Sequence, residues 1–272
     1  MLDLGKMQEV PPEELVILER VETAEAYVTE TVAVEVHHFF DRDDDRMVAS
    51  VTIDLTGHAG DQKPAVIARF APMNTPDSAR ILGEDSFRVL RGHGIRLAQG
   101  RIDLPPGSYM LTVLVADPTD LTTGLERRVI DVPEPSPRMR FSDVVWASDL
   151  DSLPFAGLAS YDEPFVVGPF RVLPKFDELY ARGETIKLFF EVYGAQMPMR
   201  VSYQLEGLED TGDWTRIGQP AIAEQHATAQ AWELQTSDHW PLGAYRIRVE
   251  VEDSEGKLIQ TMVPFELGSA GS

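Results

Sequence analysis

The sequence predicts an all-β protein built as two tandem β-sandwich domains. Three observations carry this prediction: short runs rich in β-branched and aromatic residues recur along the chain, turn residues separate the runs, and one strand pattern occurs twice. The 272 residues suit one large or two ordinary domains. A hydrophobic content of 43% with 25% charged residues is that of a globular protein.

Residues 1–24 are predicted to be an N-terminal extension, for which two interpretations stay open. Pro12, followed by two glutamates, suits the first turn of a helix. The apolar run from Leu15 to Leu18 also suits a strand. A short helix is the favoured interpretation.

The first sandwich is predicted over residues 25–133. T-V-A-V-E-V-H-H-F-F and M-V-A-S-V-T-I-D-L form a hairpin around the acidic link Asp41 to Arg46. Five more strands are expected at about 64–71, 87–91, 94–103, 108–116 and 123–132. Seven short strands with turns between them indicate a β-sandwich.

A proline-rich segment, V-P-E-P-S-P at 132–137, ends this pattern, because three prolines in five residues cannot continue a central strand. Residues 134–168 are predicted to be a connector between the domains. The connector contains Trp146, Phe155 and Phe165, so we expect it to be packed against a neighbouring domain rather than free in water.

The second sandwich is predicted over residues 169–268, followed by a flexible tail at 269–272. Its strands are F-R-V-L, I-K-L-F-F-E-V-Y, R-V-S-Y-Q-L, W-T-R-I, A-Q-A-W-E-L, Y-R-I-R-V-E-V-E and L-I-Q-T-M-V-P-F-E-L.

The repeated pattern is L-P-P-G-S-Y-M-L-T-V-L-V-A-D at 104–117 and W-P-L-G-A-Y-R-I-R-V-E-V-E-D at 240–253. In both copies every second residue of the strand is apolar, and in the second copy the residues between them are charged. This period of two predicts a strand with one buried face. The lead-in P-x-G-x-Y matches the tyrosine corner of Greek-key sandwiches, so the hydroxyls of Tyr109 and Tyr245 should hydrogen-bond back across the turn. The repeat therefore predicts equivalent late strands in two homologous domains of the immunoglobulin-like or fibronectin-III-like kind.

Four segments resemble the C-terminal β-domains of bacterial GWxTD-domain-containing proteins. They are F-S-D-V-V-W-A-S-D-L at 141–150, P-F-R-V-L-P at 169–174, R-G-E-T-I-K-L-F-F-E-V-Y-G at 182–194 and L-P-P-G-S-Y-M-L-T-V-L-V-A-D-P at 104–118. The G-W-x-T-D motif itself is absent. The resemblance implies tandem immunoglobulin-like folds and an envelope or secreted setting, and it supplies no catalytic residues.

A net charge of −21 disfavours binding to nucleic acid, because phosphate recognition needs a basic surface. No run approaches the length of a membrane span, so membrane insertion is not expected. The N-terminus lacks the features of a signal peptide. Two interpretations stay open: the protein is cytoplasmic, or this chain is part of a longer protein. With the resemblance, the expected location is the periplasm or cell envelope.

Motifs for catalysis and cofactors are missing from the sequence. It has no cysteine, no G-x-S-x-G elbow and no glycine-rich phosphate loop, and G-L-A-S-Y at 157–161 does not match the elbow. We therefore predict no enzyme, no catalytic residue and no cofactor. A hydrolase with a carboxylate pair remains as a third hypothesis.

Two candidate binding sites remain. Asp41, Asp43 and Asp45 alternate as at the start of a calcium loop, but Arg46 and Thr52 stand where an EF-hand needs glycine and glutamate. A solvated hairpin tip is the favoured interpretation, with Ca²⁺ as the alternative. Trp232 and Trp240 are either core residues, the favoured interpretation, or a platform for stacking sugars.

The predicted function is a non-catalytic protein-interaction or scaffold module, with a protein partner of unknown identity. An edge strand or the loops at one end of a sandwich would form its working surface. The alternative is a carbohydrate-binding accessory module that uses exposed tryptophans.

Overall fold

The computed structural model describes residues 31–41, 46–56, 64–92, 95–116, 124–153 and 165–269. The chain divides after Glu134 into two compact units, called here the first and second units. The described residues form strands and turns, with two short 3-10 helices at Pro76–Ser78 and Glu84–Ser86 and no α-helix. This confirms the predicted all-β class. The N-terminal extension and residues 270–272 of the tail lie outside the described residues.

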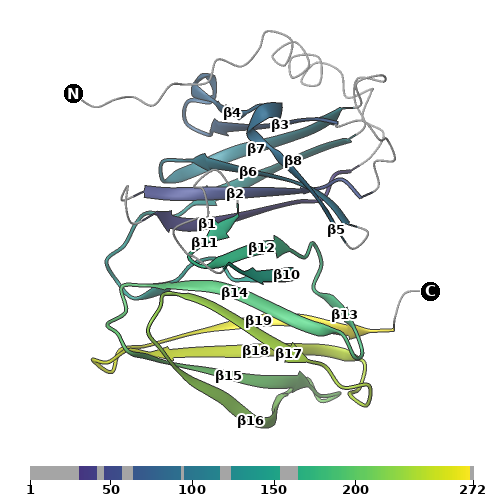
Figure 1. The fold of residues 1–272 in the computed structure, drawn as a ribbon, viewed down its shortest axis with the longest axis vertical. Coiled ribbons are helices and arrows are strands. Elements are labelled where there is room, and N and C mark those ends of the chain that lie inside the picture. The colour runs from purple at the N-terminus through teal and green to yellow at the C-terminus, as the bar shows by residue number, and fades with distance from the viewer. Residues whose placement is uncertain are drawn as a thin grey trace. The chain divides into compact units, whose positions relative to one another are not determined.

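The first unit is a sandwich of two four-stranded antiparallel sheets (Figure 1). One sheet has the order β1 (Val34–Asp41), β2 (Arg46–Asp54), β6 (Ile95–Asp103), β5 (Arg88–Gly92). The other has the order β4 (Arg80–Leu82), β3 (Ala65–Pro72), β7 (Gly107–Ala116), β8 (Gly124–Val132). These orders correspond to the A-B-E-D and C′-C-F-G sheets of immunoglobulin-like domains. Alternate residues of facing strands, such as Ile53 and Val113, share one core.

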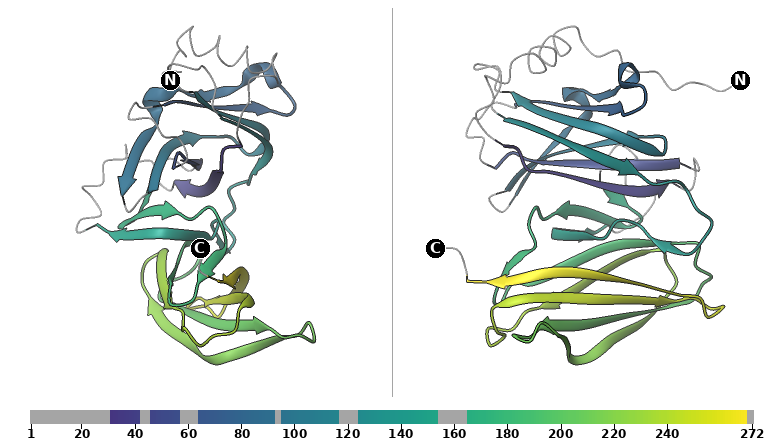
Figure 2. Two further views of the ribbon diagram at one scale, coloured as in Figure 1. Left: turned by 90° about the vertical axis from the view of Figure 1, so that its right-hand side faces the viewer. Right: turned by 180° about the vertical axis from the view of Figure 1, so that it is seen from behind.

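The second unit also packs two sheets on one core, and Figure 2 shows the strands of each unit in layers. One sheet has the order β11 (Val166–Val167), β12 (Phe170–Pro174), β10 (Val145–Ser152), β14 (Thr185–Tyr193), β17 (Ala229–Gln235), with β9 (Arg140–Phe141) also paired to β14. The other has the order β13 (Leu179–Ala181), β19 (Leu258–Gly268), β18 (Gly243–Glu252), β15 (Met199–Leu208), β16 (Trp214–Gln225).

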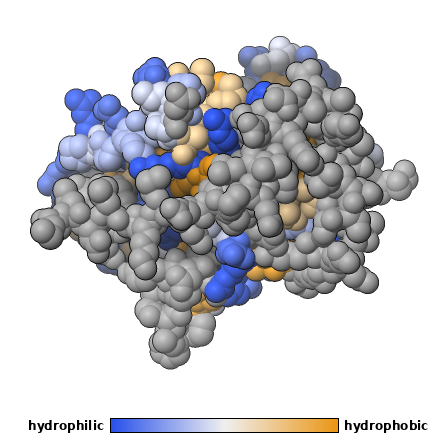
Figure 3. All heavy atoms as spheres, turned by 90° about the horizontal axis from the view of Figure 1, so that it is seen from above, coloured by the Kyte–Doolittle hydropathy of each residue, from blue (hydrophilic) through white to orange (hydrophobic). Residues whose placement is uncertain are grey.

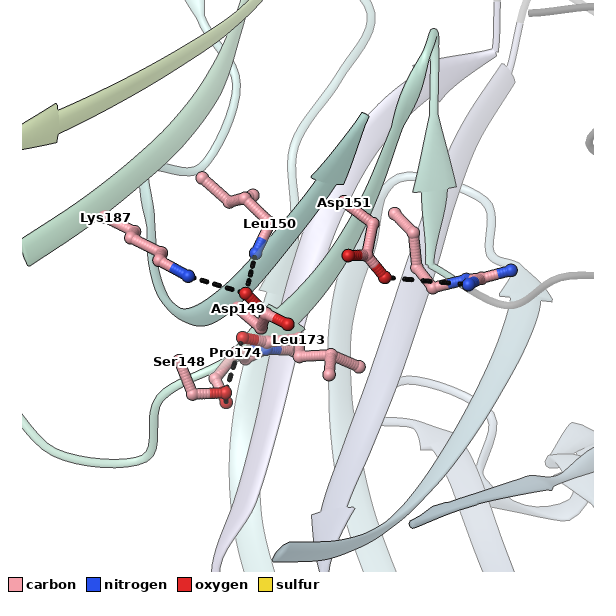
Figure 4. Close-up of polar contacts among 8 residues, drawn as sticks. Ser148, Asp149, Leu150, Asp151, Leu173, Pro174 and Lys187 are labelled. Atoms are coloured by element: carbon pink, nitrogen blue, oxygen red, sulfur yellow. Dashed lines mark hydrogen bonds and ion pairs between the residues drawn. The ribbon is translucent and has the colours of Figure 1, made fainter. Parts of the chain in front are cut away.

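The segment 134–168, predicted to be a connector, supplies strands to the second unit. Val145 to Ala147 of β10 pair with β14, and Ala147 together with Asp149 to Ser152 pairs with β12. The register shifts at Ser148, whose hydroxyl donates to the carbonyl of Leu173 at 3.0 Å. Figure 4 shows this bulge, with Lys187 of β14 2.5 Å from Oδ1 of Asp149. The bulge interrupts the alternation of β10 and the second half of this strand is mostly polar, so the sequence shows no continuous period there.

The repeated pattern forms the same strand of each sandwich. β7 lies between β3 and β8, and β18 lies between β15 and β19. The Tyr109 hydroxyl donates to the carbonyl of Pro105, and the Tyr245 hydroxyl to that of Pro241, both at 2.7 Å. This confirms the predicted tyrosine corners. Burial raises the pKa of both tyrosines above 10.0, so both hydroxyls remain donors at neutral pH.

Glycine is needed at the third position of each P-x-G-x-Y lead-in. Gly107 has a φ of 146° and Gly243 a φ of 140°, a region of backbone conformation that other residues rarely adopt. The glycine turns the chain so that the tyrosine two residues later enters the strand facing the core.

The last residue of the second copy, Asp253, holds the turn between β18 and β19. Its Oδ1 accepts hydrogen bonds from the backbone N–H groups of Glu255 and Lys257 at 3.0 and 2.9 Å. Its Oδ2 accepts one from Gln196 at 3.3 Å, on the loop between β14 and β15. Burial acts to raise the pKa of Asp253, but these backbone hydrogen bonds outweigh it and hold the pKa below 3.8.

Removing either corner hydroxyl should destabilise its own unit. Each of Tyr109→Phe and Tyr245→Phe deletes one donor and leaves a carbonyl without it, a loss of about 1 kcal/mol. Urea unfolding followed by far-ultraviolet circular dichroism of the two variants and the double variant measures this effect in both units. Equal stability of wild type and both variants would show that the corner does not contribute.

Asp253→Asn should weaken the β18–β19 turn in a pH-dependent way. Because the folded pKa is lowered, the carboxylate stabilises the fold above the ordinary value of 3.8, and this contribution is lost as the pH falls through the folded pKa. The unfolding free energies of wild type and variant should therefore differ at neutral pH and converge in acid. A difference that is constant between pH 7 and pH 3 would contradict this assignment.

Candidate interaction face

The two tryptophans predicted as sugar-stacking candidates both pack on the core of the second unit. Trp232 of β17 stacks on Tyr203, with 4.6 Å between ring centroids and 3° between ring planes. Trp240 stacks on Tyr245 at 5.9 Å and 24°. Both side chains are half-buried, so one ring face of each is already covered by a tyrosine.

Of the three aspartates predicted as calcium candidates, one lies among the described residues. Asp41 ends β1, opposite Arg46 in the hairpin register. Asp43 and Asp45 lie outside the described residues. Within the described ranges no group of three or more histidine, aspartate or glutamate side chains is placed to hold a metal ion.

A charged cluster that the sequence analysis did not identify lies on the outer face of the β13-β19-β18-β15-β16 sheet. Even-numbered residues of β15 and β18 point away from the core, so Glu206 faces outwards opposite Arg246. Nε and Nη2 of Arg246 both lie 2.7 Å from Oε2 of Glu206. Nη2 of Arg248 donates to Oε1. Glu206 is buried although it lies on an outer face, with 1% of its side chain exposed.

Trp214 of β16 covers the cluster from the side. The Cζ atom of Arg246 lies 4.2 Å from the centroid of the Trp214 ring, within the range of a cation–π contact. The guanidinium is thus fixed both by the carboxylate and by the ring. An arginine held in this way loses little further conformational freedom on binding, which favours it as an anchor for a partner.

Exposed apolar side chains lie along the same outer face, from the cluster to the opposite end of the strands. The strand registers place Leu208 opposite Trp214, Met262 opposite Arg248, Ile222 opposite Ser202 and Leu258 opposite Glu252. Their exposed fractions are 44%, 38%, 51% and 62%. Arginine, tryptophan and methionine with a polar surround is the composition typical of protein interfaces.

The edge of this face is interrupted. Leu205 pairs with Ile217 and Tyr203 with Ala221, so β16 carries two more residues than β15 between these pairs. Gly218 within the bulge has a φ of 68°. The side chain amide of Gln204 donates to the carbonyls of Leu205 and Ile217 at 2.7 and 3.2 Å, which stabilises the bulge from the neighbouring strand.

The buried carboxylates of the described residues are all engaged. Glu206 binds two arginines, Asp253 accepts backbone N–H groups, and Oε2 of Glu191 accepts the Tyr193 hydroxyl at 2.6 Å. A general acid or base needs a proton-exchanging group that faces a substrate, whereas these carboxylates are held by structural partners.

On the face of the molecule drawn in Figure 3, hydrophilic and hydrophobic residues lie side by side among those that are coloured. Single apolar residues such as Val129, 52% exposed on β8, are ordinary for a protein surface. The outer face that holds Glu206 differs because it carries exposed apolar residues together with a fixed arginine–tryptophan pair.

The fold and this face together define a tandem β-sandwich protein. No protein-family model matches the chain, and no curated protein matches it. Solved structures with similar folds include the fibronectin(III)-like modules of Clostridium thermocellum CbhA, with 12% identity, 82% of this chain and 86% of that chain covered, and a TM-score of 0.25.

Two further similar structures are longer proteins. One is the tetra-tandem repeat in the extending region of a large adhesion protein. It is 11% identical, the match covers 89% of this chain and 50% of that chain, and the TM-score is 0.25. The other is trypsin-activated alpha-2-macroglobulin of Escherichia coli. It is 10% identical, the match covers 89% of this chain and 17% of that chain, and the TM-score is 0.30. This chain spans half or less of these two chains. Likenesses of this size carry no information about activity.

Replacing the buried carboxylate should destabilise the second unit. Glu206→Gln leaves Arg246 and Arg248 without a counter-charge at a site where the carboxylate is buried, and we expect a loss of about 2–4 kcal/mol. Urea unfolding measures this loss. Glu252→Gln is the matched control, because its ion pair with Arg200 spans 3.9 Å between exposed side chains and should contribute less than about 0.5 kcal/mol. Equal effects of the two substitutions would show that the cluster is not a structural unit.

Proposed function

We propose that the chain is a non-catalytic protein-interaction module whose working surface is the outer face of the β13-β19-β18-β15-β16 sheet. The observation that carries this proposal is the Arg246–Trp214 pair held over the buried Glu206. The pair lies on the strands of a packed sheet, with four exposed apolar residues on the same face. Rigid aromatic and arginine anchors at the centre of a patch are typical of binding hot spots.

The non-catalytic character is supported by how the buried carboxylates are used. Each is bound by arginine, tyrosine or backbone, and the sequence supplies no nucleophile motif. Carbohydrate binding through Trp232 and Trp240 has less support, because a tyrosine already stacks on one face of each ring.

The proposed setting is a bacterial protein outside the cytoplasm, as a scaffold in the periplasm or cell envelope. The resemblance of four segments to GWxTD-domain-containing proteins supports this setting, and membership of that family remains a prediction. Among the described residues there is no helix of sufficient length and hydrophobicity to cross a membrane.

The test compares two aspartate substitutions at exposed apolar residues. Met262→Asp places a charge opposite Arg248 on this face, whereas Val129→Asp places one on β8 of the first unit, and both wild-type residues are exposed. Immobilised wild type and Val129→Asp should retain the same protein from an extract of the source organism, and Met262→Asp should lose it, by about tenfold in affinity with the purified partner. The proposal is wrong if Met262→Asp retains every partner of the wild type.

A further inference from the structure

We infer that the partner of this face is a second copy of the same chain, paired face to face through a two-fold axis. The inference rests on the proposed function and specifies its partner. It comes from the way charge is distributed along the strands, which makes the face complementary to itself when one copy is reversed.

The two ends of the face carry opposite charge. The end near Trp214 holds Arg216, Arg246 and Arg248 against Glu206 and Glu266, three positive and two negative groups with a formal charge of +1. The other end holds Arg200 against Glu224, Glu250 and Glu252, one positive and three negative groups with a formal charge of −2. Along β18 alone, Arg246 and Arg248 are followed by Glu250 and Glu252.

A two-fold axis that lies between two such faces and runs across the strands places the positive end of each copy over the negative end of the other. Sheets that pack face to face keep their strands within about 30° of alignment, so β18 of one copy lies roughly antiparallel over β18 of the other. With the axis between the levels of Arg248 and Glu250, Arg248 approaches Glu250 of the second copy and Arg246 approaches Glu252, and the symmetry repeats each contact. Met262, level with Arg248 near the middle, meets Gln260 of the second copy, which is level with Glu250.

The size of the face and its charge suit a dimer. Ten residues of β18 and four inter-strand spacings give an extent of roughly 34 by 19 Å, or about 650 Å² per copy, close to the roughly 800 Å² per partner of a standard interface.

The chain as a whole has a net charge of −21, whereas this face sums to −1. Repulsion between the rest of the two chains is screened beyond about 8 Å at physiological ionic strength.

The experiment reverses the charge of one end of the face in each variant and then mixes the two variants. Arg216→Glu turns the +1 end into −1, so two copies of this variant present only negative ends to each other. The double variant Glu250→Arg with Glu252→Arg turns the −2 end into +2, so its copies present only positive ends. A mixture of the two variants restores opposite charges at both contacts.

Sedimentation equilibrium of the full chain measures self-association. We expect a dimer for the wild type, at least about tenfold weaker association for each variant alone, and recovery to within about threefold of the wild type on mixing. Arg127→Glu, an exposed residue of β8 with the same change in charge, should dimerise like the wild type. Circular dichroism melts show whether every variant is folded.

A monomeric wild type at every soluble concentration would overturn the inference, as would mixed variants that associate no better than each alone. Neither result bears on the proposed function, which depends on whether Met262→Asp loses a partner that Val129→Asp keeps. A monomer that still binds another protein through Met262 would refute self-pairing and leave the interaction module in place.

Discussion

The hydrogen bond from a tyrosine hydroxyl to a carbonyl four residues earlier fixes the start of one strand in each unit, and the rest of each sandwich is arranged around that strand. β7 and β18 each lie inside a sheet and pair on both sides. Since side chains alternate with a period of two, fixing where Tyr109 and Tyr245 enter the core decides which residues of the strand are buried. Neighbouring strands then follow the same register, including β15, which carries Glu206.

The arrangement of the second unit follows from how its chain is divided between two sheets before β14. β9 and β10 pair with β14, β10 also pairs with β12 across the Ser148 bulge, and β13 pairs in parallel with β19. One stretch of chain therefore contributes to both layers. This arrangement leaves the outer side of the β18-containing sheet as a broad surface of alternating charged and apolar residues, while the inner side shares one core with the opposite layer.

The long strands of both units could be predicted because their apolar residues alternate over seven or more positions, as in T-V-A-V-E-V-H-H-F-F and Y-R-I-R-V-E-V-E. β4, β11 and β13 have three residues or fewer, which is too short for any period to be recognised. The candidate face could not be predicted for a different reason. Glu206 and Arg246 are 40 residues apart, and only the antiparallel register of β15 and β18 brings them together. In the sequence, Arg246 and Arg248 indicate only that one face of a strand is exposed to solvent.

The bulge in β16 has a consequence for how molecules of this chain can accumulate. A strand of 12 residues at the border of a sheet presents unpaired backbone groups, and an uninterrupted border of that length is a template on which further chains add and fibres grow. Gly218 and Pro220 interrupt this border at its middle, since proline lacks an N–H group and the two extra residues disturb the spacing of the rest. The interruption therefore works against the addition of further strands at β16, while the outer face of the sheet stays available for contact.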